Sequence, residues 1–191
     1  MFLAGFQVCE GEIDLEFKVG ENHESPMPAG TASSCSFACN AATTEDAGSL
    51  AHLAAAAFRG KTRFRKPWFS DQEVGSMYSL WVNNAITGDF DDVCLKVNDR
   101  DGQTIGLVTL RTLNKSDARI GLLAVRDTAR RIGVGGFLVE EAKAWAVKQG
   151  CCRLFTATQM SNIDALRLYV RRGAVPIQTA YWLYRTANKG I

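Results

Sequence analysis

The residues with the clearest chemical potential lie in a glycine-rich segment at 130–136, with the sequence Arg-Arg-Ile-Gly-Val-Gly-Gly. An apolar run at 120–125 precedes it, and an amphipathic run at 137–148 follows it. A strand, a turn and a helix in that order would place unpaired backbone N–H groups and the positive end of the helix dipole at the turn. Glycines let a pyrophosphate approach such a backbone, and Arg130 and Arg131 can donate paired hydrogen bonds to phosphate. The segment therefore predicts an anion-binding turn, although a glycine-bearing turn with solvated arginines would have the same sequence.

Two other kinds of phosphate-binding loop do not fit this segment. The chain has no GxxxxGK[ST] sequence, which a P-loop requires. It also has no GxGxxG sequence followed about 20 residues later by an acidic residue at the end of a second strand. Neither a P-loop nucleotide site nor a dinucleotide-binding fold is therefore expected.

The spacing of Arg130, Gly133 and Gly135 resembles the [RQ]-x-x-G-x-[GA] motif of the GNAT acetyltransferases. The order of strand, loop and helix around the motif is also that of the family, and the similarity extends from about residue 43 to residue 185. The resemblance implies an α+β fold, with a mixed and mostly antiparallel sheet flanked by helices. It also implies acetyl-CoA as the co-substrate, with no metal.

The resemblance further implies which residues hold the coenzyme. The motif backbone would bind the pyrophosphate, and the preceding strand would lie along the pantetheine arm like an additional strand. The expected CoA-binding residues are Leu122, Leu123, Ala124, Val125, Arg130, Arg131, Gly133, Val134, Gly135, Gly136, Asn162 and Arg167.

Catalytic residues are expected on a short helix at 162–171. The resembling family places its general-acid tyrosine at the position of Tyr169, and a phenol with a pKa near 10 is protonated at neutral pH. A core tyrosine would have the same spacing, Asn162 could be a plain helix cap, and Arg167 could be a solvated arginine. The general base is not evident, because 120–125 holds no acidic residue and Asp117 and Asp127 only flank it.

Several further blocks resemble the branch of the family that acetylates nucleotide amino-sugars. They are 63–68, 116–124, 157–160 and 180–185, and the similarity covers nearly the whole chain. It implies acetyl transfer to the 4-amino group of dTDP-4-amino-4,6-dideoxygalactose (TDP-fucosamine), in enterobacterial common antigen synthesis, by a possible homodimer. The alternatives are a GNAT enzyme acting on a protein N-terminus or a small amine, and a non-catalytic acyl-CoA-binding module.

A basic and aromatic run at 59–68 is the candidate acceptor site. Arg63 and Arg65 could pair with the dTDP diphosphate, and Trp68 could stack on thymine. A basic loop that covers the core between two helices would have the same sequence. Nucleic-acid binding is not expected, because the run is isolated and the net charge of the chain is only +2.

Composition limits the remaining classes. Apolar residues make up 47% of the 191 residues, and no apolar run approaches the roughly 20 residues of a membrane-spanning helix. The N-terminus lacks the basic and apolar regions of a signal peptide. The six cysteines form no pair of CxxC motifs, so no metal site is expected. We therefore expect a cytoplasmic protein with reduced thiols and no membrane insertion.

The elements that must position these residues follow from hydrophobic periodicity and turn residues. We expect helices at 43–58, 71–86, 137–148 and 162–171, the second with a capping box from Ser70 and Glu73. We expect strands at 12–19, 93–97, 104–113, 118–125, 152–158 and 175–185. Residues 1–20 are interpreted as a remnant of an N-terminal subdomain, 21–42 as a linker rich in small residues, and 43–191 as the acetyltransferase domain.

Overall fold

The computed structural model describes residues 5–20 and 37–185. One seven-stranded sheet organises them, in the order β2-β3-β4-β5-β6-β1-β7. The strands are β1 (Gln7–Lys18), β2 (Ala38–Ala41), β3 (Val93–Asn98), β4 (Thr104–Thr112), β5 (Asp117–Val125), β6 (Arg153–Gln159) and β7 (Val175–Tyr184). The helices are α1 (Ala47–Phe58), α2 (Asp71–Thr87), α3 (Val134–Lys148) and α4 (Ile163–Arg171).

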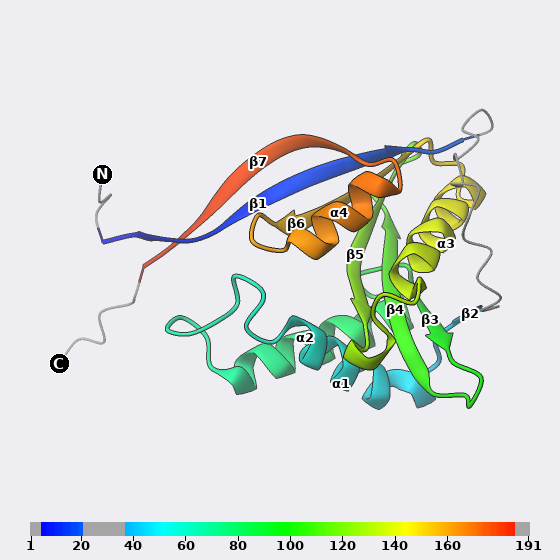
Figure 1. The fold of residues 1–191 in the computed structure, drawn as a ribbon, viewed down its shortest axis with the longest axis horizontal. Helices are drawn as coiled ribbons and strands as arrows, with labels where there is room; N and C mark the ends of the chain where they lie inside the picture. The colour runs from blue at the N-terminus through cyan, green and yellow to red at the C-terminus, as the bar shows by residue number, and fades with distance from the viewer. Residues whose placement is uncertain (1–4, 21–36, 186–191) are drawn as a thin grey trace.

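Helices cover both faces of the sheet (Figure 1). The alternation of side chains along the strands divides the core between the two faces. On β4, Leu107 packs with α1 and α2, whereas its neighbour Val108 packs with α3. On β5, Leu122 and Ala124 point toward α1 and α2 in the same way. Each face therefore has its own buried cluster, as the period of two along a strand requires.

The helices expected from the sequence are all present. The capping box of α2 is confirmed, since the Ser70 hydroxyl accepts from the Glu73 N–H at 3.2 Å and the Glu73 carboxylate accepts from the Ser70 N–H at 2.8 Å. Helix α3 begins at Val134 rather than at 137. The glycines at 135 and 136 are therefore in its first turn.

The parallel pair β5–β6 is short. These strands pair only over Asp117–Arg119 and Arg153–Phe155 within the described sheet. Further along β5, its pairing with β4 shifts register between Val108 and Leu110. The backbone N–H of Leu122 donates there to the Thr109 hydroxyl at 2.8 Å instead of to a backbone carbonyl. Because the pairing with β6 ends at Arg119, the second half of β5 has no strand partner on its β6 side within the described sheet.

The N-terminal strand belongs to the same sheet as the rest of the described chain. It lies within the segment 1–20, which was expected as a remnant of an N-terminal subdomain, and β1 pairs antiparallel with both β6 and β7. Leu15 and Phe17 of β1 are buried in the α3-side core. Strands β1 and β7 together form a long ribbon that reaches past the end of the other strands (Figure 1). Of the linker expected at 21–42, residues 21–36 lie outside the described residues, and Ala38–Ala41 form the edge strand β2.

Candidate active site

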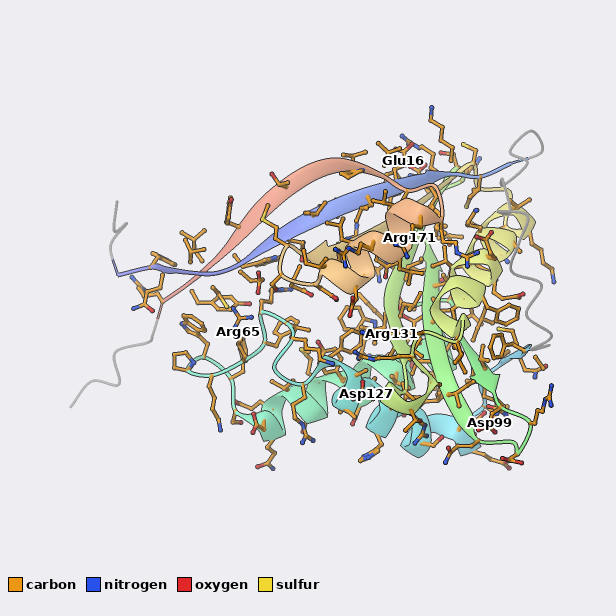
Figure 2. All side chains as sticks on the ribbon, viewed as in Figure 1. Glu16, Arg65, Asp99, Asp127, Arg131 and Arg171 are labelled. Carbon is orange, nitrogen blue, oxygen red and sulfur yellow. The ribbon has the colours of Figure 1, made fainter. Side chains whose placement is uncertain are left out.

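A cavity of about 1360 Å³ opens where β5 separates from β6. Its walls are the end of β5, the loop 126–133, the first turn of α3, the length of α4 and the end of α1. Figure 2 labels Arg131 in the loop before α3 and Arg171 at the end of α4, the two segments that flank the cavity.

The strand wall consists of three of the four β5 residues expected there. Leu123, Ala124 and Val125 line the cavity. Leu122 does not line it, and its side chain packs in the α1–α2 core. The unpaired edge of β5 at 123–125 can receive an extended chain by backbone hydrogen bonds.

The turn expected to bind an anion lies at the start of α3. Gly133 is the N-cap of α3 with φ +101°, a conformation that side chains disfavour, and it makes no side-chain cap. Gly133, Gly135 and Gly136 line the cavity. Val134 is 1% exposed and its side chain packs in the core, so it can contribute only through its backbone. The first N–H groups of α3 are thus available to an anion in the cavity.

Arginines dominate the polar wall. The expected Arg130, Arg131 and Arg167 line the cavity, and so do Arg171 and Arg172, which sequence reasoning missed. Arg171 could have been expected from the sequence, since it lies one helical turn after Arg167 and shares a face of α4 with it. Five guanidinium groups beside a helix N-terminus make this wall suited to a ligand with several phosphates.

Asn162 can act both as a helix cap and as a contact to the coenzyme. Its side-chain oxygen accepts a hydrogen bond from the Ala165 N–H at 3.3 Å, which makes it the N-cap of α4. Asn162 also lines the cavity, where its amide nitrogen can donate to a carbonyl.

Tyr169 lies beneath the cavity and is not among the residues that line it. Its side chain is 5% exposed, its ring meets that of Phe17 edge-on at 6.2 Å, and its hydroxyl is hydrogen-bonded to Thr156. Burial raises the pKa of Tyr169, and the hydrogen bond with Thr156 only partly opposes this. The phenol is therefore protonated at neutral pH, and its catalytic role stays a prediction.

The three residues expected to bind the nucleotide-sugar do not line the cavity. Arg65 donates to the Glu10 carboxylate at 2.9 Å, to the Cys9 carbonyl at 2.7 Å and to the Thr62 carbonyl at 3.1 Å. It thereby fixes the loop 59–70 to β1. Sequence reasoning could not find these partners, because β1 is far away along the chain.

The other two expected residues, Arg63 and Trp68, pack against β7. Arg63 stacks over the Trp182 ring at 3.5 Å and donates to the Tyr184 hydroxyl at 3.0 Å. Trp68 meets Tyr184 edge-on at 5.4 Å. Arg63 and Trp68 therefore join the loop 59–70 to the β1–β7 ribbon. This packing agrees with the alternative interpretation of the run at 59–68 as a basic loop that covers the core.

Residues 62–174 match the family described as Acetyltransferase (GNAT) family. A curated dTDP-fucosamine acetyltransferase from Escherichia coli O6:H1 is 40% identical over 181 residues, which cover 95% of this chain and 72% of that protein. The chain belongs to the GNAT acetyltransferase family.

Solved structures agree with the GNAT fold. A GCN5-related N-acetyltransferase from Sphaerobacter thermophilus has a TM-score of 0.62 at 17% identity, over 94% of this chain and 52% of that one. A GNAT acetyltransferase from Colwellia psychrerythraea has a TM-score of 0.61 at 15% identity, over 93% of this chain and 56% of that one. The chain spans about half the length of these two proteins. The expected fold class is confirmed.

GNAT acetyltransferases use acetyl-CoA as co-substrate, and the residues of this GNAT chain fit it. The unpaired edge of β5 suits the pantetheine arm, and the arginine wall with the α3 N-terminus suits the phosphates. Among the described residues, no group of three or more His, Cys, Asp or Glu side chains could hold a metal ion. In the same part of the chain, no helix combines the length and apolar character needed to cross a membrane.

The acidic residues that flank the GNAT motif are engaged elsewhere. Asp117 makes a paired contact with Arg153 at 2.7 and 2.8 Å, and this hydrogen bonding lowers the pKa of Asp117. Asp127 pairs with Arg130 at 2.8 Å. Neither carboxylate lines the cavity.

Glu10 is a carboxylate near the cavity that sequence reasoning missed. It is 9% exposed and accepts hydrogen bonds from Arg65 at 2.9 Å and from the Ser161 hydroxyl at 3.1 Å. Burial alone would raise the pKa of Glu10, but the hydrogen bonds from Arg65, Ser161 and the Gly11 N–H outweigh it and lower the pKa. Ser161 lines the cavity, so the charged Glu10 fixes part of its wall.

Proposed function

We propose that this chain transfers the acetyl group of acetyl-CoA to the 4-amino group of dTDP-4-amino-4,6-dideoxygalactose (TDP-fucosamine). The 40% identity to the dTDP-fucosamine acetyltransferase supports the acceptor. The observation that carries the proposal is the single cavity in which the β5 edge, the α3 N-terminus and five arginines meet. A cytoplasmic location and a homodimer stay predictions from the sequence.

The cavity is lined by two chemically different sets of residues, which supports a reaction between two substrates. Arginines and the α3 N-terminus make up one set, and Phe58, Gly60, Lys61 and Ser161 make up the other. In the proposed reaction the neutral sugar amine attacks the thioester carbonyl carbon and the carbon–sulfur bond breaks. The CoA thiolate takes up one proton, and the nitrogen of the new amide releases one proton to water. The sugar would bind beside Lys61, which lines the cavity and whose ammonium can pair with a phosphate of the acceptor.

Tyr169 is the proposed donor of the proton that the thiolate takes up. Its phenol is protonated at neutral pH because burial raises its pKa. Its neighbour Leu168 lines the cavity, so Tyr169 lies directly under the α4 wall. A small shift of α4 when substrates bind would be needed to bring the hydroxyl to the sulfur.

The direct test is a competition among acceptors. The protein is incubated with acetyl-CoA and a mixture of dTDP-4-amino-sugars, peptides with free N-termini and small amines, and the products are identified by mass spectrometry. We expect acetylation of the dTDP-4-amino-sugar in preference to the other amines. The matched control is a dTDP-sugar with a 4-hydroxyl in place of the amine, which should stay unmodified.

Two results would contradict the proposal in different ways. Preferential acetylation of peptides or small amines would support the alternative of a GNAT enzyme with another acceptor. Binding of acetyl-CoA without acetylation of any amine would instead support a non-catalytic acyl-CoA-binding module.

A further inference from the structure

Helix α4 crosses the first turn of α3 at two neighbouring points. A Cβ atom built on Gly135 would lie 3.2 Å from Cδ2 of Leu168. A Cβ atom built on Gly136 would lie 2.7 Å from Cζ and 2.9 Å from Nε of Arg172. Leu168 and Arg172 are one helical turn apart, and only glycine at 136 leaves room for the guanidinium. The charged end of Arg172 therefore rests on the N-terminal turn of α3.

This placement is electrostatically unfavourable without an anion. The N-terminus of a helix carries a partial positive charge, so a guanidinium beside it is repelled. Glu140, one turn further along α3, supplies the compensating charge, with its carboxylate 3.5 Å from Nη1 of Arg172. The Glu140 carboxylate is shared, because its other oxygen lies 3.0 Å from Nζ of Lys143.

The contact between Arg172 and Glu140 is loose enough to be exchanged. The two side chains are 31% and 32% exposed, and both residues line the cavity. Ion pairs with this much solvent contribute little to stability. An anion bound at the first turn of α3 would meet backbone N–H groups on one side and the Arg172 guanidinium on the other.

We propose that Arg172 is a binding residue for the diphosphate of the coenzyme, and that Glu140 holds its guanidinium in place until the diphosphate replaces Glu140 as the counter-ion. The inference rests on the proposed use of acetyl-CoA. It adds a contact from α4 to the contacts that the backbone at 133–136 offers, so the diphosphate is held between two helices. Binding of the coenzyme thereby also ties α4, which carries Tyr169, to α3.

The test compares acetyl-CoA with S-acetyl-pantetheine, which keeps the thioester arm but lacks the diphosphate and the 3′-phosphoadenosine. Dissociation constants for acetyl-CoA are measured by calorimetry, and those for S-acetyl-pantetheine by calorimetric competition. Arg172→Gln should weaken acetyl-CoA binding about tenfold or more, as expected for a lost hydrogen bond between charged groups. It should leave the affinity for S-acetyl-pantetheine unchanged. Lys115→Gln is the matched control, because it removes one positive charge from an exposed turn away from the cavity.

A second variant tests the role of Glu140. Glu140→Gln removes the competing counter-ion and should tighten acetyl-CoA binding about threefold. The same change in an Arg172→Gln background should have no such effect, because the competition requires both charges. Should Arg172→Gln fold poorly, the single variant Glu140→Gln still decides, since unchanged acetyl-CoA affinity in it would overturn the exchange of counter-ions.

The possible outcomes separate this inference from the proposed function. Wild-type protein that does not bind acetyl-CoA would overturn both. Wild-type protein that binds acetyl-CoA, with unchanged affinity in Arg172→Gln or an equal loss for both ligands, would overturn the role of Arg172 alone. An effect of Glu140→Gln that is the same with and without Arg172 would overturn the exchange of counter-ions.

Discussion

Two arginine-rich regions lie close to the cavity, and the fold uses them in opposite ways. Arg63 and Arg65 lie in the loop between α1 and α2, and their guanidinium groups contact β1 and β7. Arg131, Arg167 and Arg171 lie on the cavity wall and form no ion pair with any residue in the ranges 5–20 and 37–185. The first region joins parts of the protein, and the second presents unused donors to a ligand.

The difference arises from what lies opposite each region. The loop 59–70 faces Glu10, Trp182 and Tyr184, which offer a carboxylate, a π face and a hydroxyl. The cavity wall instead faces the space left by the separation of β5 from β6. An arginine is available to a ligand only where the protein has not already engaged its donors, and sequence composition alone does not distinguish these two cases.

Tyr169 is the residue that could break this comparison, because it is engaged within the protein and yet is predicted to do chemistry. Tyr169→Phe should lower turnover between about a hundredfold and ten thousandfold, the range for loss of a positioned general acid, with acetyl-CoA affinity unchanged. Steady-state kinetics and calorimetry measure the two effects.

Tyr78→Phe is the matched control for Tyr169→Phe. Tyr78 is also buried, its hydroxyl contacts Thr62 at 3.3 Å, and burial raises its pKa to about 12. It does not line the cavity. Turnover should therefore survive Tyr78→Phe, and equal turnover in both variants and the wild type would leave Tyr169 a core residue only.

Removing the joining arginine should affect stability and leave coenzyme binding intact. Arg65→Met leaves the buried Glu10 carboxylate without its cationic partner, so the free energy of unfolding should fall by about 3 kcal/mol. Arg130→Met removes a cavity arginine whose ion pair with Asp127 is exposed to solvent. This substitution should change the free energy of unfolding by less than about 1 kcal/mol. Urea denaturation measures both variants. The opposite ranking would contradict the division into joining and ligand-facing arginines.

The pH dependence of stability is a second measurement of the ion pair between Glu10 and Arg65. The folded-state pKa of Glu10 is lowered, so its contribution to stability is present above its unfolded pKa of about 4.3 and is lost as the pH falls through the folded value. In Arg65→Met the folded-state pKa of Glu10 is no longer lowered by the arginine. The free energy of unfolding of the wild type should therefore decline more steeply below about pH 4.3 than that of Arg65→Met. Parallel declines in the two proteins would argue against the Glu10–Arg65 contact.

The sequence was most informative where neighbouring residues make the structure. Arg130, Gly133 and Gly135 share one turn, and the local pattern around them predicted the order of strand, turn and helix that the structure has. The partners of Arg63 and Arg65 lie 121 and 55 positions away, so no local pattern could show that their donors are occupied. The position of Arg172 over Gly136 likewise depends on how α4 crosses α3, which is a property of packing.

The place of β1 and β2 in the sheet was hidden for a related reason. The alternation of apolar residues predicted a strand in the N-terminal region, but a strand pattern does not say which neighbours it pairs with. The four residues of β2 are too few to show an alternation. The irregular pairing of β4 with β5 was hidden as well, because it joins Leu122 to the Thr109 hydroxyl, 13 positions away along the chain.

The ligand-facing region can be tested at its backbone. Gly133→Val places a β-branched residue where φ is +101°, a conformation that costs such residues about 1–3 kcal/mol. We expect the turn to relax away from this geometry and the acetyl-CoA dissociation constant to rise by about tenfold or more. Gly102→Val is the control, since Gly102 has φ +80° in the β3–β4 turn away from the cavity. Equal effects of both variants on affinity would remove the turn at 133 from the site.

Arg131→Gly offers the sharpest contrast, because it should change binding and stability in opposite directions. Arg131 has φ +64°, which glycine adopts without the cost of about 1 kcal/mol that an L side chain incurs. The free energy of unfolding should therefore rise by up to about 1 kcal/mol, while the acetyl-CoA dissociation constant rises about fivefold through loss of one phosphate contact. Arg131→Ala separates the two effects, since it loses the same guanidinium but keeps the strained backbone, and should bind as weakly without the gain in stability. If Arg131→Gly bound acetyl-CoA as tightly as the wild type, Arg131 would instead be a solvated arginine at the edge of the cavity. Ligand binding would then not explain why an arginine occupies a position with φ +64°.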